Sequence, residues 1–254
     1  MLYVTFSVDR IREMVMGESP TSRRGVYASA AMIDRRVRIL RETRRLIADE
    51  GAPALRLTAV AEAAGVAINT LYGLFGRREE LIAHAVLDGF GTETGAEDTA
   101  PRSLAANLQR LRRTAGYFRG RRNELAGLVS IYFSATTSAE IRSLIDDGSR
   151  RANDAWVRAN INGLGLADPP RLTEALTRWE FATLFDWSID RLSDTEAPTE
   201  LAQGHLRLLS AFSRGELSDQ IARHMSGRGR DAPSPIATSV HRSNPLPQVL
   251  SAGA

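Results

Sequence analysis

Hydrophobic residues in the middle of the chain recur every three or four positions, which is the period of an amphipathic α-helix. Glycines and prolines interrupt these stripes and mark the helix ends. Between residues 28 and 225 there is no convincing alternation of apolar and polar residues of the kind that marks a half-buried strand. The pattern therefore predicts an all-α fold of about nine helices, over residues 30–50, 58–64, 68–74, 78–90, 102–118, 123–136, 139–160, 170–192 and 198–225.

The two ends of the chain differ from this middle part. Residues 1–27 join a short apolar start to a charged run, and we expect a poorly ordered extension there. Met14 and Met16 are alternative starts, so the sequence does not say whether residues 1–27 are translated in the native protein. Residues 226–254 carry Gly, Ser, Pro and Arg with hardly any large apolar side chain. We predict a disordered tail, because such a segment cannot bury enough surface to offset its ordering entropy.

A polar stretch after residue 90 divides the middle part in two. We expect a smaller domain over residues 28–90 and a larger helical domain over residues 91–225. Positive charge is concentrated in the first part: residues 20–82 hold 11 Arg against 7 acids, whereas residues 91–225 hold 17 Arg against 18 acids. A positive excess of this kind favours contact with phosphate groups.

All 33 basic residues are arginine, and the chain contains neither lysine nor cysteine. This composition excludes enzymes that depend on a lysine or a thiol, as well as disulfides and cysteine metal sites. The four histidines, His84, His205, His224 and His241, are scattered without the spacing of metal ligands. We therefore expect no catalytic residues, no metal and no cofactor, and a protein that is not an enzyme. Its uncharged stretches are too short to cross a bilayer, so we expect a cytoplasmic protein with no membrane partner.

Residues 57–76 meet the steric demands of a helix-turn-helix. The small Ala61 would let two helices cross closely, Gly65 can adopt a left-handed turn conformation, and Leu71 would fill the corner between the helices. Taken alone, the spacing also fits an ordinary helix pair inside a bundle, or a chance match in an Ala-rich sequence. The residues predicted to form the core of the helix-turn-helix are Ala61, Gly65, Val66, Leu71 and Phe75.

The sequence around this helix pair resembles the signature of the TetR family of bacterial transcriptional regulators. The resemblance covers roughly residues 35–90 and is carried by Ala64-Gly65-Val66, Thr70-Leu71-Tyr72, Phe75 and Arg78-Glu79-Glu80-Leu81. It implies an N-terminal three-helix head that binds DNA, followed by a larger helical domain for ligand binding and dimerisation.

The resemblance also implies a function. The protein would be a sequence-specific DNA-binding transcriptional regulator, a ligand-responsive repressor that acts as a homodimer on a palindromic operator. Its partners would be double-stranded DNA, a second copy of the chain and a small-molecule effector. The alternative is a helical adaptor or ligand-binding protein whose helix-turn-helix no longer binds DNA. The sequence does not identify the effector, the operator or the target genes, and it does not say whether the protein represses or activates.

The front of the second helix is expected to read base edges in the major groove. Asn69 can pair with adenine, and Ile68 can touch a thymine methyl group. Arg56 stands where the family usually has Ser or Thr, and it could reach a phosphate. The full set of expected DNA contacts is Arg56, Thr58, Ile68, Asn69, Thr70, Tyr72, Arg77 and Arg78.

By the same resemblance, the larger domain would hold the effector pocket and the dimer surface. Aromatic residues at helical spacing are more often core than pocket wall, and the apolar stripes of the last helices also fit an intrachain core. The aromatic residues expected at the pocket are Tyr117, Phe118, Tyr132, Phe133, Trp156 and Trp187. Those expected at the dimer surface are Trp179, Phe185, Leu201, His205, Leu208 and Phe212.

Overall fold

The computed structural model describes residues 23–95, 101–165 and 168–226. These residues form α-helices and two short 3-10 turns, with a single isolated bridge between Leu164 and Ser213 and no strand, so the all-α prediction is confirmed. The helices of the described part are α2 (Arg23–Glu50), α3 (Leu57–Ala64), α4 (Ile68–Phe75), α5 (Arg78–Thr94), α6 (Leu104–Phe118), α7 (Arg122–Phe133), α8 (Ala139–Ala159), α9 (Pro169–Ser188), α10 (Ala197–Ser210) and α11 (Gly215–Met225). The 3-10 turns are η1 (Ala52–Ala54) and η2 (Ile161–Gly163).

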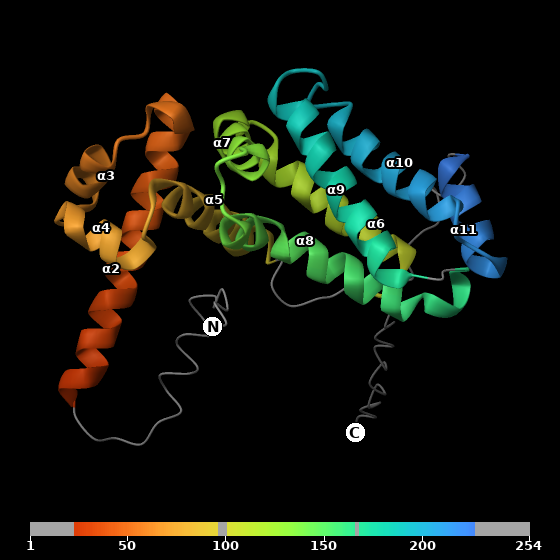
Figure 1. Ribbon diagram of the computed structural model, residues 1–254, viewed down its shortest axis with the longest axis horizontal. Helices are drawn as coiled ribbons and strands as arrows, with labels where there is room; N and C mark the ends of the chain where they lie inside the picture. Colours follow the sequence, from red (N-terminus) through yellow and green to blue (C-terminus); the bar gives the residue numbers. More distant parts are fainter. Residues whose placement is uncertain (1–22, 96–100, 166–167, 227–254) are drawn as a thin grey trace, which may run out of the picture.

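We call helices α2 to α5 the head and helices α6 to α11 the body. In the head, α2 packs against α3 on one side and against α5 on the other, and α4 follows α3 (Figure 1). Ile39 and Ile47 of α2 are fully buried against this group, because they lie on the apolar stripe of the helix. By length and composition none of the described helices could span a membrane alone; only α3 and α4 taken together could, and their axes are bent by 104°.

The head and the body share one hydrophobic core. The cluster that contains Ile39 continues through α5 into α7, α8 and α9, where it includes Leu125, Ile141 and Phe181. A second cluster around Trp156 and Leu176 lies within the body. The head is therefore held to the body by packed side chains rather than by a linker alone.

Close packing between the two parts is visible at η1. A Cβ atom on Gly127 of α7 would come within 2.6 Å of Ala52 Cβ, so only glycine fits this contact. Next to it, Asn123 Nδ2 donates a hydrogen bond of 2.8 Å to the Ala48 carbonyl near the end of α2. The start of α7 thus fixes the C-terminal end of α2.

The predicted helix over residues 198–225 is wrong as a single element, because the structure has two helices, α10 and α11, in its place. Between them the chain pairs with the segment around η2: Arg214 N donates to Gly163 O at 2.8 Å, and Gly165 N donates to Phe212 O at 2.8 Å. Gly215 has a φ of 56°, which favours glycine and turns the chain away from the helical path. These long-range hydrogen bonds replace the helical ones that the local pattern predicts.

Three further helix boundaries differ from the sequence prediction by four residues or more. α2 begins at Arg23, so part of the expected extension over residues 1–27 is helical, and residues 1–22 lie outside the described part. α5 continues to Thr94, four residues past the predicted end. α9 stops at Ser188 rather than 192. The expected disordered tail, residues 226–254, lies outside the described residues except for Ser226.

A buried charged network joins four helices of the body. Arg110 of α6 forms a two-pronged ion pair with Glu180 of α9, with distances of 2.5 Å from Nη2 to Oε1 and 3.0 Å from Nη1 to Oε2. Asn153 Nδ2 of α8 donates to the same Oε1 at 2.9 Å, and His205 Nε2 of α10 lies 3.0 Å from it. One carboxylate therefore holds α6, α8, α9 and α10 in register.

Glu180 is almost completely buried, with 2% of its surface exposed. Burial alone would raise the pKa of this carboxyl, but the Arg110 charge and the hydrogen bonds from His205 and Arg110 more than offset burial and place the pKa well below its usual range. Glu180 is therefore ionised at neutral pH, and removing it would leave Arg110 buried without its counter-ion.

We predict that Glu180→Ala lowers the free energy of unfolding by about 3–5 kcal/mol, because a buried ion pair loses one partner. Urea unfolding followed by circular dichroism at a fixed protein concentration measures this loss. Because folding lowers the pKa of Glu180, its contribution is present at neutral pH and is lost as the pH falls below about 4.

The matched control is Glu174→Ala, six residues earlier on α9, which removes an exposed ion pair with Arg178. We expect this variant to lose less than about 1 kcal/mol. Equal losses for the two variants would contradict the role given to the network.

Candidate nucleic-acid interface

The turn between α3 and α4 has the geometry of a helix-turn-helix. Gly65 adopts a left-handed conformation, with φ 62° and ψ 45°, and its N–H and that of Val66 close the end of α3 on the carbonyls of Glu62 and Ala61. Ala61 is buried where the helices cross, and Leu71 is 2% exposed in the corner between them. Phe75 is buried at the end of α4. The two helix axes are bent by 104°, within the range of about 90–120° that the motif shows.

The outer face of α4 is open. Asn69 is exposed near the start of the helix, and Tyr72, one turn later, is 52% exposed. Ile68 and Thr70 are half-buried, and Ile68 packs partly against the core of the head. Among the described residues, no other segment covers this face. Asn69 and Tyr72 are thus the solvent-exposed side chains of this face, and α4 itself lies at the outer side of the head in Figure 1.

Three helices of the head begin without a side-chain cap. The N-cap residues of α3, α4 and α5 are Arg56, Ala67 and Arg77, and none of their side chains accepts a hydrogen bond from a backbone N–H group. Among the body helices, α6, α8 and α9 are capped by Ser103, Ser138 and Asp168, whereas α7, α10 and α11 also begin without a side-chain cap. Uncapped helix starts present free N–H groups and the positive end of the helix dipole, which together bind phosphate groups.

The two neighbouring arginines Arg77 and Arg78 have different surroundings. The Arg78 guanidinium donates to the carbonyls of Leu55, Ala52 and Pro53, at 2.9 Å for Leu55 and 3.3 Å for Pro53. It thereby ties the start of α5 to η1. Arg77 is exposed and makes no side-chain hydrogen bond or ion pair with any residue of the described part. Of the two, Arg77 has its guanidinium available to a phosphate.

The remaining expected DNA contacts lie at the start of α3. Arg56 and Thr58 are both exposed there. Thr58 is the second residue of α3, since the helix begins at Leu57. Their side chains face solvent beside the uncapped N–H groups of the helix.

Several arginines of α2 serve the head itself. Arg36 lies over the Phe75 ring at 4.6 Å, and Arg38 Nε donates to Ala64 O at 2.8 Å, which closes the end of α3. Burial, followed by the Arg36 charge, lowers the pKa of the adjacent His84 to about 4, so this histidine is neutral at physiological pH. The aromatic and cationic contacts around Phe75 fix the end of α4 against α2.

The aromatic residues expected at an effector pocket do not converge on one cavity. Tyr117 and Phe118 pack together with Phe90, whereas Tyr132 and Phe133 pack with Phe181 and Phe185. The remaining two, Trp156 and Trp187, are fully buried in different core clusters. This arrangement corrects the sequence expectation, because the helical stripes that carry these rings face two cores.

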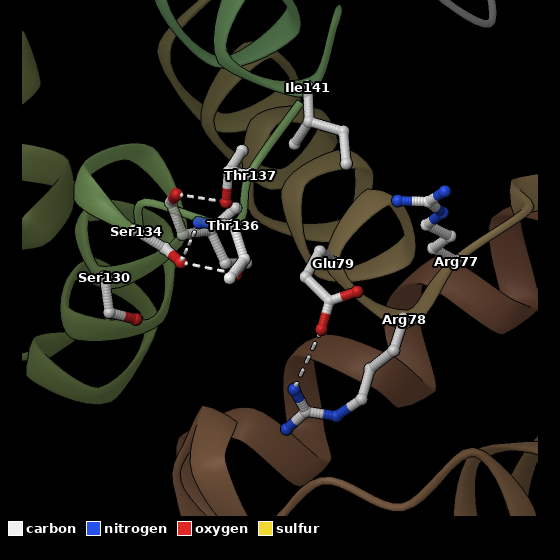
Figure 2. Close-up of a pocket in the computed structure, with 9 residues that line it drawn as sticks. Arg77, Arg78, Glu79, Ser130, Ser134, Thr136, Thr137 and Ile141 are labelled. Carbon is white, nitrogen blue, oxygen red and sulfur yellow. Dashed lines mark hydrogen bonds and ion pairs between the residues drawn. The ribbon is translucent and has the colours of Figure 1, made fainter. Parts of the chain in front are cut away.

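A cavity of about 400 Å³ lies elsewhere, where the start of α5 meets the end of α7 and the start of α8 (Figure 2). Sequence reasoning missed it because its walls come from three distant segments and contain no aromatic residue. A smaller cavity of about 170 Å³ lies beside the turn between α6 and α7. The larger cavity is lined by Arg77, Arg78, Glu79, Ser130, Ile131, Ser134, Thr136, Thr137 and Ile141.

Two residues expected at a dimer surface are inside the chain. Leu201 and His205 have no exposed surface, because the inner face of α10 packs on α6 and α9. Their assignment to an interface is therefore wrong. The other four remain at least partly accessible. Among them, the Trp179 indole packs against Gly204 of α10 so closely that a Cβ atom on Gly204 would overlap the ring. These four are Trp179, Phe185, Leu208 and Phe212.

The comparisons with known proteins agree with this geometry. A family model described as bacterial regulatory proteins, tetR family, matches residues 39–85, from the middle of α2 into α5. The chain is similar to the HTH-type transcriptional repressor KstR of Mycobacterium tuberculosis (strain ATCC 25618 / H37Rv), with 28% identity over 177 residues, or 68% of this chain and 80% of that protein.

Solved structures share the fold. A TetR transcriptional regulator from Rhodococcus sp. RHA1 has a TM-score of 0.56 and 21% identity, covering 69% of this chain and 95% of that chain. A tetR-family transcriptional regulator from Streptomyces coelicolor has a TM-score of 0.52 and 18% identity, covering 76% of this chain and 89% of that chain. These matches identify the helix-turn-helix segment, residues 39–85, as a domain of the tetR family of bacterial regulatory proteins, and they show that the described part of the chain has the fold of TetR-family regulators.

Proposed function

We propose that this regulator binds a palindromic operator as a homodimer and that a small-molecule effector releases it, which makes it a ligand-responsive repressor. The observation that supports this proposal most is the open outer face of α4, flanked by three uncapped helix starts. The similar protein KstR is itself a transcriptional repressor. A helical adaptor with an inactive head is the alternative, but it gives no reason for such a face to be left uncovered.

In this proposal α4 enters the major groove with its N-terminal end foremost. Asn69 would pair with adenine through its amide, and the exposed part of Ile68 would touch a thymine methyl group. Thr70 and Tyr72 would donate their hydroxyl hydrogens to phosphates. Arg77, the exposed Arg56 and Thr58, and the free N–H groups of α3, α4 and α5 would hold the backbone and set the register of the head.

A second copy is needed because one recognition helix reads too few base pairs for useful specificity. The outer face of α9 and its C-cap residue offer a surface for it: Ala182 is exposed, Phe185 is half-buried and the C-cap Ile189 is 44% exposed. Phe133 of α7, 49% exposed, packs edge-on against Phe185 with ring centres 5.3 Å apart and widens this apolar strip. Exposed apolar strips of this kind commonly mark protein interfaces. We propose that two copies join through it.

We predict that Asn69→Ala relaxes the preference at one base pair in each half-site. The loss of a paired amide removes about 1–3 kcal/mol of discrimination against the wrong base. Selection of binding sites from a random pool of duplexes, followed by sequencing, compares the variant with the unmodified chain. An unchanged preference at every position would remove Asn69 from base reading.

We predict different outcomes for the two neighbouring arginines. Arg77→Ala should weaken binding to all duplexes alike and reduce the slope of log affinity against log salt by about 1, because one phosphate contact is lost. Its unfolding free energy should stay unchanged. Fluorescence anisotropy at several salt concentrations and urea unfolding measure the two effects.

Arg78→Ala should instead lower the unfolding free energy by about 2–3 kcal/mol, because several charged hydrogen bonds to backbone carbonyls are lost. Arg78→Lys should recover only part of this, since one ammonium group cannot span the carbonyls of Ala52 and Leu55 as the guanidinium does. A stable Arg78→Ala protein with a reduced salt slope would show that Arg78, too, is a phosphate contact.

We predict that Ala182→Glu makes the protein monomeric, because the substitution places a charge in the apolar strip of both copies. Sedimentation velocity measures the change in mass. Ala222→Glu, on the exposed face of α11, is the control and should leave the mass unchanged. A dimer that persists with Ala182→Glu would place the interface elsewhere.

A further inference from the structure

The larger cavity lies at the joint between the DNA-binding head and the body. One wall is the start of α5, directly after the recognition helix, and the facing wall is the end of α7 and the turn into α8 (Figure 2). The volume of about 400 Å³ falls within the range of about 300–1,000 Å³ of small-molecule sites. An occupant of this cavity would touch both parts of the protein.

The body wall mainly offers hydrogen-bond acceptors. Ser130 Oγ donates its hydrogen to Gly127 O at 3.0 Å, and Thr137 Oγ1 donates to Ile131 O at 2.7 Å. Both hydroxyls therefore keep only lone pairs for a ligand. The Ser134 and Thr136 hydroxyls lie 2.9 Å apart and share one hydrogen bond, so this pair has one hydrogen left. A ligand at this wall must bring its own O–H or N–H donors.

The head wall combines one available cation with one carboxylate. Arg78 is engaged by the carbonyls of η1, and Arg77 is exposed without a partner among the described residues. Glu79 is partly exposed, and its only ion pair among the described residues is a long one of 3.7 Å to Arg78. The uncapped N–H groups of α5 add to the positive end of this wall.

One further acid lies near the cavity. Glu140, in the first turn of α8, has its pKa lowered by the Ser138 hydroxyl and its own backbone N–H, and by the Arg77 charge to a smaller extent. This carboxylate is held mainly by its own helix start, so the Arg77 guanidinium retains its donors for another anion.

We propose that this cavity binds a small polyhydroxylated anion, such as a sugar acid or a sugar phosphate. The anionic group would pair with Arg77 and the first N–H groups of α5, while the ligand hydroxyls would donate to Glu79 and to the hydroxyl wall. Ile131 and Ile141 would contact the C–H face of such a molecule. An apolar anion leaves the acceptors unsatisfied, and a cation is repelled by Arg77.

The same geometry couples the ligand to DNA, and this part rests on the proposed function. Arg77 is the guanidinium that we assign to a DNA phosphate, and a ligand anion bound to it would engage its donors and repel the phosphate charge. Ligand and operator therefore compete, and each weakens the binding of the other by the same factor. The ligand acts directly at the head and does not require a pocket in the aromatic clusters of the body.

Isothermal titration calorimetry of the full chain at constant ionic strength tests the ligand class. The probes are D-gluconate and glucose 6-phosphate, with sorbitol as the uncharged control and hexanoate as the apolar anion. We expect at least one hydroxylated anion to bind about tenfold or more tightly than both controls, since a charged hydrogen bond is worth at least that factor. The anion that binds more tightly of the two shows whether the site prefers a carboxylate or a phosphate group. No binding by either anion, or equal binding by a control, overturns the proposal.

A variant pair tests the site and its coupling to DNA. The double variant Ser134→Ala with Thr136→Val should bind the anion about tenfold or more weakly. Its affinity for the operator in the absence of ligand should stay unchanged. The control is Ser143→Ala, at an exposed position of α8. If the double variant fails to fold, Thr136→Val alone replaces it. The bound anion should weaken operator binding by the unmodified chain. The proposal is contradicted if the double variant binds the anion as tightly as the unmodified chain does, or if the bound anion leaves operator affinity unchanged. If the chain binds no operator at all, the proposed function is contradicted instead.

Discussion

The close crossing of α3 and α4 is the constraint on which the DNA-binding account depends. Gly65 takes a positive φ of 62°, Ala61 leaves room for the facing helix, and Leu71 seals the corner. A larger side chain at either of the first two positions would push α4 outwards or strain the turn. Because the inner face of α4 is used in this way, its outer face, with Asn69 and Tyr72, remains open.

The arginines of this chain, which has no lysine, fall into a structural group and an exposed group. Arg38, Arg78 and Arg110 direct their planar, multiply donating groups at backbone carbonyls or a buried carboxylate, a task to which a guanidinium is better suited than an ammonium group. Arg56 and Arg77 are left exposed beside uncapped helix starts. The local surroundings of each arginine, rather than the total charge, separate the residues that build the head from those available to phosphate.

The sequence predicted the all-α class and the helix-turn-helix well, because both depend on local periodicity and on residues such as Gly65 whose conformational demands are visible in one short segment. The sequence prediction failed where contacts between distant segments determine a helix end or the burial of a side chain. The break before α11 comes from hydrogen bonds to Gly163 and Gly165, and the burial of His205 comes from its contact with Glu180. Neither partner is marked by spacing along the chain. For the same reason, the cavity at the joint between head and body could not be expected.

Capture of genomic DNA fragments by the purified chain, followed by sequencing, tests the central claim most directly. The account predicts enrichment of an inverted repeat whose half-site centres lie about one helical turn of DNA, or a multiple of it, apart, because two exposed α4 helices related by a two-fold axis would read it. Recovery of fragments without a common sequence, or of none above background, would contradict the claim that α4 is presented to a DNA groove.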